Sequence, residues 1–136
     1  MLFWGGGTWR YHRRMAIPSG AVVRARLRPA AALFRSLGDP ARLEILRSLA
    51  VAPARVTDLV ERLGLAQATV SAHLGCLRDC GLVSVQAVGR SSVYRLAPAV
   101  EPAVLALFAA GEQVLEATGD AVALCPTYGD TTAEQS

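Results

Sequence analysis

The sequence has 136 residues, the length of a single domain, and 52% of them are hydrophobic, which is enough for a packed interior. The 14 basic residues, all of them arginine, and the 11 acidic residues give a net charge of +3, which weakly favours an anionic partner over an acidic substrate. No apolar run approaches the roughly 18 uncharged residues of a membrane span, and the chain starts with apolar residues before basic ones, the reverse of a secretory signal. We therefore expect no membrane partner and a cytoplasmic location.

Two helices are predicted in the first third of the chain. Residues 1–20, rich in glycine and aromatic side chains, are expected to be an irregular extension in which Met15 is a candidate initiator. Apolar residues then recur at steps of three and four, which predicts a helix over 21–37 with one apolar face: Leu27, Ala31, Phe34 and Leu37. A second helix is predicted to begin at Pro40, capped by Asp39, and to stop before Pro53. Its inward residues are expected to be Leu43, Leu46 and Leu49.

A pair of short helices joined by a tight turn is predicted next. Thr57 is expected to cap a third helix that ends at Gly64 and buries Leu59, Val60 and Leu63. A fourth helix is predicted over 66–80, ended by Gly81 in the left-handed conformation with Leu82 folding back onto it. Ala66 takes its N-cap position, where serine or threonine would be about 1 kcal/mol more favourable. This arrangement predicts a helix-turn-helix.

The second half of the domain is predicted to contain a hairpin and one more helix. Segments 82–88 and 92–97 alternate apolar and polar residues around Gly89 and Arg90, which predicts a β-hairpin. Helical spacing returns over 100–117 with Val104, Leu107, Phe108, Val114 and Leu115. The order of elements predicts a mainly α (α+β) winged helix-turn-helix with the hairpin as its wing. We expect this domain to span 21–117, between the extension at 1–20 and a flexible polar tail at 118–136.

The helix predicted over 66–80 has the pattern of a DNA-reading helix. Val70, Leu74 and Leu77 form one stripe that must face the core, whereas the opposite face is lined by Ala68, Ala72 and Gly75 and is slim enough to approach a major-groove floor. Recognition helices contact bases with their N-terminal residues, and arginine side chains bind backbone phosphates. The predicted DNA contacts are therefore Gln67, Thr69, Ser71, His73, Arg78 and Arg90. The competing interpretation is a helical bundle whose small exposed residues have no function, but the hairpin and its arginine tip argue against it.

The same helix carries two of the three cysteines. Three is an odd count, which argues against a disulfide framework. Cys76 and Cys80 are four residues apart, so their Cβ atoms are about 5 to 6 Å apart, and Cys125 in the tail could supply a third sulfur to one ion. Three soft sulfurs favour Cd(II), Pb(II) or As(III). Zn(II) normally takes four ligands, and His73 could supply the fourth ligand of a zinc site. The alternative is that Cys76 and Cys80 are small buried hydrophobic residues.

Three stretches of the sequence resemble a known family. "LGDPARLEILRSL", "VTDLVERLGLAQATVSAHLGCLRDCGLV" and "GRSSVYRLA" resemble the ArsR/SmtB metalloregulatory repressors, and "CLRDC" with a later cysteine resembles their CmtR-type Cd(II)- and Pb(II)-sensing branch. The resemblance covers about residues 24–117 plus Cys125, and residues 1–14 have no counterpart in it. It implies a homodimer, built from the first and last helices, that binds operator DNA and represses a metal-efflux operon. It also implies a three-thiolate site formed by Cys76 and Cys80 of one protomer and Cys125 of the other.

Because the ion and the operator would use one helix, metal binding is expected to lower the affinity for DNA, a coupling typically worth about 1 to 3 kcal/mol. Other functions stay open: an arsenite- or thiol-redox-sensing repressor on the same scaffold, or a winged-helix protein-interaction module. Ligation by Cys125 within its own chain and across a dimer are both compatible with the residue pattern. We expect no enzyme and no small organic substrate, because the sequence offers no catalytic His/Asp or His/Asn set beyond His73 and no Gly-rich phosphate loop.

Overall fold

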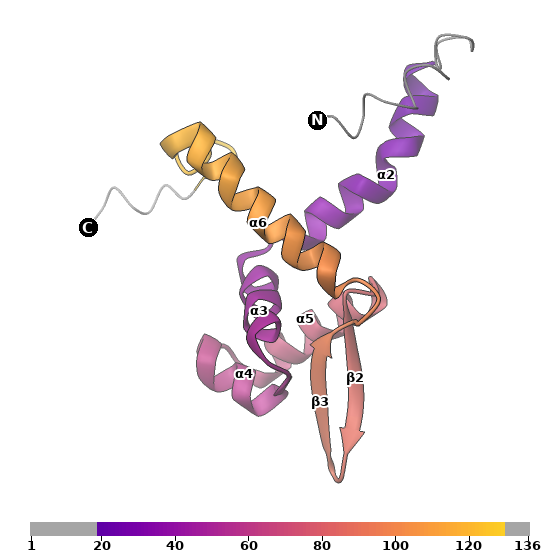
Figure 1. Ribbon diagram of the computed structural model, residues 1–136, viewed down its shortest axis with the longest axis vertical. Coiled ribbons are helices and arrows are strands. Elements are labelled where there is room, and N and C mark those ends of the chain that lie inside the picture. Colours follow the sequence, from indigo (N-terminus) through magenta and orange to yellow (C-terminus); the bar gives the residue numbers. More distant parts are fainter. Residues whose placement is uncertain (1–18, 130–136) are drawn as a thin grey trace. The chain divides into compact units, whose positions relative to one another are not determined.

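The structure is a computed structural model that describes residues 19–129 (Figure 1). Met15, and all of the predicted extension at 1–20 except its last two residues, lie outside this range. The chain divides into two compact units, one up to Asp39 and one from Pro40 onward. The first unit contributes helix α2. The second contributes the remaining helices and a three-stranded antiparallel sheet.

Helix α2 spans Gly20–Leu37, which confirms the helix predicted over 21–37. It begins at Ser19, whose hydroxyl accepts from the backbone N–H of Val22 at 3.4 Å. It ends at Gly38, whose N–H donates to the carbonyl oxygen of Phe34 at 2.9 Å. Its predicted apolar face is open to solvent in this single chain: Leu27 is 52% exposed and Phe34 is 60% exposed.

Three helices form the core of the second unit: α3 (Pro40–Val51), α4 (Val56–Leu63) and α5 (Gln67–Asp79). Pro40 begins α3 and the helix stops before Pro53, both as predicted. Leu46 and Leu49 are buried as predicted, whereas Leu43 is only partly buried. The largest fully buried side chains in the described residues come from these helices and the sheet: Ile45, Leu46, Leu59, Val70, Leu74, Leu77 and Leu96.

The start of α4 differs from the prediction. Thr57 is not its N-cap, because the helix already begins at Val56 and Arg55 holds the cap position. The backbone N–H of Arg55 donates to a carboxylate oxygen of Asp58 at 3.0 Å, the bond of a capping box in which the N3 side chain reaches back to the N-cap. Arg55 is held there by a short strand, β1 (Ala54–Arg55), that pairs with β3 and that the sequence did not predict. The predicted end at Gly64 is confirmed by its φ of 68°.

Both ends of α5 behave as predicted. Ala66 is the N-cap and makes no side-chain capping bond. At the other end Gly81 has a φ of 76°, and the N–H of Leu82 donates to the carbonyl oxygen of Leu77 at 3.0 Å. This pattern is a Schellman motif, and it buries Leu82.

The predicted hairpin is formed by β2 (Val83–Val88) and β3 (Ser91–Leu96), joined through Gly89 and Arg90. The strand order is β1-β3-β2. In the hairpin register Val83 lies opposite Leu96 and Val88 opposite Ser91, so the two strands are matched over their full length. Gly89 has a φ of 62°, a conformation that glycine adopts without steric cost. Within its unit, the hairpin extends beyond the helices as a wing (Figure 1).

The last helix, α6, spans Glu101–Thr118 and is followed by a single 3-10 turn, Gly119–Ala121. Only the first half of its predicted apolar stripe packs on the unit: Val104 is 5% exposed, but Val114 is 56% exposed and Leu115 is 45% exposed. Arg47 of α3 contacts the middle of α6. Its guanidinium carbon lies 5.7 Å from the centroid of the Phe108 ring, and its terminal nitrogen forms an ion pair with Glu112. The fold is therefore the predicted winged helix-turn-helix, mainly α with a small antiparallel sheet.

Candidate nucleic-acid interface and thiol site

Helix α5 presents the two faces that the sequence predicted. Its inner stripe, Val70, Leu74 and Leu77, has no solvent exposure and fixes the helix against the core. The opposite face is open: Ala68 and Ala72 are exposed and Gly75 is partly exposed. No atom lies within 4 Å of the point where a Cβ at Gly75 would stand, so the backbone here can be approached closely from outside.

The predicted DNA-contacting side chains lie on α5 and at the wing. Gln67, Thr69 and Ser71 are exposed along the first two turns of α5, and Arg78 is exposed in its last turn. Arg90 is exposed at the turn of the hairpin. His73 differs from the other five because it is partly buried. The arrangement places short polar side chains on the helix and guanidinium groups around it, which suits base edges and phosphates respectively.

Cys76 and Cys80 occupy the last turn of the same helix. Both thiols are free and exposed, so the interpretation of the pair as small buried hydrophobic residues is wrong. The N–H of Cys80 donates to the carbonyl oxygen of Cys76 at 3.0 Å, which puts the two residues one helical turn apart. Cys80 is the C-cap residue, immediately before the left-handed Gly81. The two sulfurs can therefore be reached together from outside the protein.

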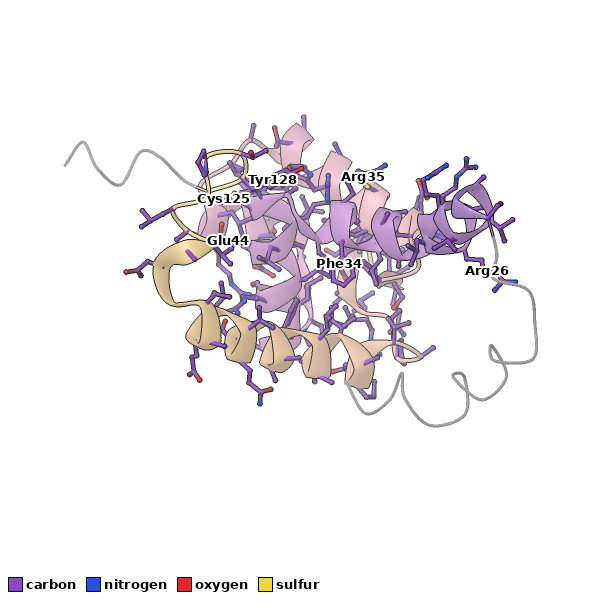
Figure 2. All side chains as sticks on the ribbon, turned by 90° about the horizontal axis from the view of Figure 1, so that it is seen from above. Arg26, Phe34, Arg35, Glu44, Cys125 and Tyr128 are labelled. Carbon is purple, nitrogen blue, oxygen red and sulfur yellow. The ribbon has the colours of Figure 1, made fainter. Side chains whose placement is uncertain are left out.

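Cys125 lies in the loop after α6, close in sequence to Tyr128, and is partly buried (Figure 2). The backbone N–H groups of Thr127 and Tyr128 donate to its sulfur and lower the pKa of the thiol, with a smaller contribution from Gly129, while partial burial opposes them. The N–H of Gly129 also donates to the carbonyl oxygen of Cys125 at 2.7 Å. These bonds favour the thiolate, the form of cysteine that binds metals.

Gly129 closes this loop at a point where no side chain fits. A Cβ at position 129 would collide with the carbonyl oxygen of Ala123 and with the backbone nitrogen and oxygen of Cys125. The surroundings of Cys125 therefore depend on three residues that the sequence reasoning did not assign to the site, namely Thr127, Tyr128 and Gly129. The turn-forming residues Pro126 and Gly129 were the sequence features that could have predicted a closed loop around Cys125.

The structure brings together two of the three predicted sulfur ligands. Within residues 19–129 of one chain, no three His, Cys, Asp or Glu side chains are grouped so that they could hold a metal ion. Cys125 thus does not join Cys76 and Cys80 in a three-ligand cluster within a single chain. Also within this range, no helix is both long and apolar enough to cross a membrane.

Comparison with known proteins identifies the family. Residues 39–85 match the family model described as bacterial regulatory protein, arsR family. The chain is also 30% identical to a solved winged helix-turn-helix DNA-binding domain, Mb0332 from Mycobacterium bovis, described as homodimeric and a possible ArsR-family transcriptional regulator. That match covers 77% of this chain and 93% of the other, with a TM-score of 0.58. The chain belongs to the ArsR family. The resemblance predicted from sequence and the winged fold are both confirmed.

Curated relatives of this ArsR-family chain include two named regulators. A probable mercury resistance operon repressor from Streptomyces lividans is 41% identical over 64 residues, 47% of this chain and 51% of the relative. The HTH-type transcriptional regulator CmtR from Mycobacterium tuberculosis is 45% identical over 67 residues, 49% of this chain and 57% of the relative. The match thus spans about half the length of these two relatives. Both names are those of regulators, in agreement with the expectation that this ArsR-family chain is not an enzyme.

Proposed function

We propose that the chain is a metal-responsive transcriptional repressor that binds operator DNA as a homodimer and is released when a thiophilic ion, Cd(II) or Pb(II), is bound by Cys76, Cys80 and Cys125. One observation carries the proposal. Cys76 and Cys80 are exposed in the last turn of α5, the helix whose small, exposed outer face is suited to the major groove. A ligand on these sulfurs and a duplex on this helix would therefore act on the same element.

Binding to DNA is supported by the surface of α5 and the wing. Gln67, Thr69 and Ser71 would contact base edges, with His73 at the side of the helix, and Arg78 and Arg90 would contact phosphates. The regulators and repressors among the relatives support the same role. Repression of a bacterial promoter would place the chain in the cytoplasm. It requires no membrane and no small organic substrate.

Assembly as a homodimer is supported by apolar side chains that one chain leaves open. On α2 these are Val23, 41% exposed, Leu27 and Phe34, and on α6 they are Val114 and Leu115. Exposed apolar surface on two separate helices marks an interaction site. The similar Mycobacterium bovis domain is described as homodimeric. We therefore assign the first and last helices to the dimer interface.

The available ligands fit a soft metal ion. All three cysteines are free, and Cys76 and Cys80 are exposed one turn apart. The lowered pKa of the Cys125 thiol favours the thiolate that such an ion requires. Because one chain does not group the three residues, we assign Cys125 to the partner protomer, as the family resemblance implies. The ion would supply a bond between the end of α5 and the loop after α6.

The packing of α5 suggests how an ion bound at its C-terminal end could affect DNA contacts at its N-terminal end. Cys80 is 13 residues beyond Gln67, so the proposed ligands and the first base-contacting residue are about 20 Å apart along the helix. Val70, Leu74 and Leu77 are fully buried between these ends, so α5 and the core on which it packs would move as one piece. Tension on the Cys80 end would therefore reorient this body and move the N-terminal turns of α5 away from the bases. This is a coupling between two sites through one shared element.

A titration of operator binding tests the proposal. The probe is a labelled duplex carrying the promoter of the chain's own gene, and Cd(II) is added to the wild type and to Cys76→Ser. We expect saturating Cd(II) to weaken wild-type binding by about five- to 150-fold and to leave Cys76→Ser unaffected. Ultraviolet sulfur-to-metal charge-transfer absorption should develop in the wild type and diminish in Cys125→Ser. An equal loss of DNA affinity in wild type and Cys76→Ser would refute the thiol site.

The second candidate is an arsenite- or redox-sensing repressor on the same scaffold. It is favoured by the exposure of two neighbouring thiols, which reagents in solution can reach directly. Release of the duplex by As(III) or by peroxide, without release by Cd(II) or Pb(II), would select it. Release by Zn(II) that is lost in His73→Ala would instead indicate a zinc site completed by His73. Failure to bind any promoter duplex at low salt would favour the protein-interaction module.

A further inference from the structure

Positive charge is unevenly divided between the two units of the chain. Residues 1–39 contain seven of the 14 arginines and one acidic residue, Asp39, a net charge of +6. Residues 40–136 contain the other seven arginines and 10 of the 11 acidic residues, a net charge of −3. The unit that carries α5 and the wing therefore has an excess of negative charge, although its proposed ligand is a polyanion. Charge asymmetry of this kind indicates that the basic part contributes its own contact with an anionic partner.

The arginines of α2 are placed where they weaken the helix. Arg24, Arg26 and Arg28 are all exposed, and α2 contains no acidic residue that could pair with them along the helix. Arg24 and Arg28 are one turn apart, so their like charges repel. A bound anion would relieve this repulsion.

The arginines also leave the apolar side of α2 free for another use. At 100° per residue, Val23, Leu27 and Phe34 form one stripe, with Arg24 and Arg28 on one side of it and Arg26 on the other. The side chain of Arg26 extends away from the helix axis (Figure 2). The helix can therefore pack its apolar stripe on a second protomer while its guanidinium groups remain accessible. Guanidinium is the side chain best suited to bidentate contact with phosphate.

We propose that Arg24, Arg26 and Arg28 of α2 bind backbone phosphates of duplex DNA, in addition to the phosphates contacted by the helix-turn-helix and the wing. This inference rests on the proposed DNA-binding function but not on the metal site. The contact carries no sequence information, so it raises affinity for operator and non-operator DNA alike. It makes α2 a second electrostatic anchor of the repressor.

The test uses the full chain and two labelled duplexes, one of arbitrary sequence and one carrying the promoter of the chain's own gene, over a range of NaCl concentrations. The variant Arg24→Gln/Arg26→Gln/Arg28→Gln removes the charges, and the corresponding triple lysine variant keeps them. We expect the glutamine variant to bind both duplexes at least about tenfold more weakly at low salt. The slope of log affinity against log salt should become shallower by about 0.9 for each phosphate that the variant no longer neutralises. The lysine variant should keep the wild-type slope.

Unchanged affinity and slope in the glutamine variant, while the wild type binds both duplexes, would overturn this inference and leave the proposed function intact. A wild type that binds neither duplex would overturn the proposed function itself. Sedimentation of both variants separates direct contact from assembly, because loss of the dimer in the glutamine variant alone would overturn a phosphate contact. Binding of the wild type and the glutamine variant to vesicles of phosphatidylglycerol tests whether the arginines contact a membrane surface. Arginine-dependent binding to the vesicles, with no arginine effect on duplex binding, would assign the face to a membrane surface instead.

Discussion

The backbone N–H of Cys80 donates to the carbonyl oxygen of Cys76, so the two residues with exposed thiols are joined by a backbone hydrogen bond at the C-terminal end of α5. Immediately beyond this bond Gly81 turns left-handed and Leu82 folds back into the core. The end of the helix is thus fixed by a local motif, and the proposed ligands are part of that motif. Any change that loosens the motif should affect the thiols before it affects the rest of the fold.

Gly81→Ala tests this dependence. The φ of 76° at Gly81 is strained for any residue with a Cβ, so the substitution should destabilise the fold by about 1 kcal/mol. The last turn of α5 should fray, and Cd(II) affinity should fall with it. Chemical unfolding and a Cd(II) titration measure the two effects. A variant with reduced stability but wild-type Cd(II) affinity would show that the thiols do not depend on the C-terminal motif.

Gly75→Ala should separate stability from DNA binding. Gly75 is inside α5, and a Cβ there would meet no atom within 4 Å, so alanine should stabilise the helix by about 0.5 to 1 kcal/mol. The added methyl group stands on the face proposed to approach the groove. We therefore expect a raised Tm together with weaker operator binding, measured by thermal unfolding and anisotropy. A variant that is more stable and binds the operator with unchanged affinity would remove Gly75 from the interface.

The features that the sequence predicted are those with local causes. The limits of α5 follow from a stripe of apolar residues ending at Gly81, and the neighbourhood of Cys76 and Cys80 follows from helical spacing alone. Strand β1 could not be predicted in this way, because two residues carry no periodicity and form a strand only by pairing with Tyr94 and Val93. The misassigned cap of α4 has the same cause, since that pairing holds Arg55 at the cap position.

Periodicity also shows which side of a helix is apolar without showing what covers it. Val104 and Leu115 belong to one stripe of α6, but Val104 is buried in its own unit and Leu115 is not. The environment of Cys125 was likewise beyond sequence reasoning. It depends on a loop that closes through bonds from Thr127 and Tyr128, and such closure is a matter of three-dimensional geometry.

The lowered pKa of Cys125 predicts its reactivity with pH. In Cys76→Ser/Cys80→Ser, which keeps one thiol, alkylation by iodoacetamide should reach half its maximal rate at a lower pH in the native protein than in concentrated urea. The folded pKa lies below the unfolded one, so deprotonation favours the native loop at alkaline pH, and this contribution is lost as pH falls through the folded pKa. Equal midpoints in native and unfolded protein would contradict the bonds from Thr127 and Tyr128.

Gly129→Ala is the matched control for that measurement. A Cβ at position 129 would collide with the backbone of Ala123 and Cys125, so the loop must open. The native alkylation midpoint should then rise toward the value in urea, without a large change in Tm, because none of the described residues beyond Val104 is buried. A midpoint that stays low in Gly129→Ala would mean that the thiolate is stabilised by something other than this loop.

The exposed apolar residues of α6 allow the proposed dimer interface to be tested. Val114 and Leu115 are 56% and 45% exposed, so aspartate at position 115 removes little from the core of its own chain. In the proposed dimer the same carboxylate would be buried against the partner without a counter-charge, which is strongly unfavourable. Leu115→Asp should therefore sediment as a monomer with a folded winged domain and bind a two-site operator far more weakly than the wild type. Val51→Asp, at a residue that is 87% exposed on α3, should leave the dimer intact. A dimeric Leu115→Asp would place the interface elsewhere.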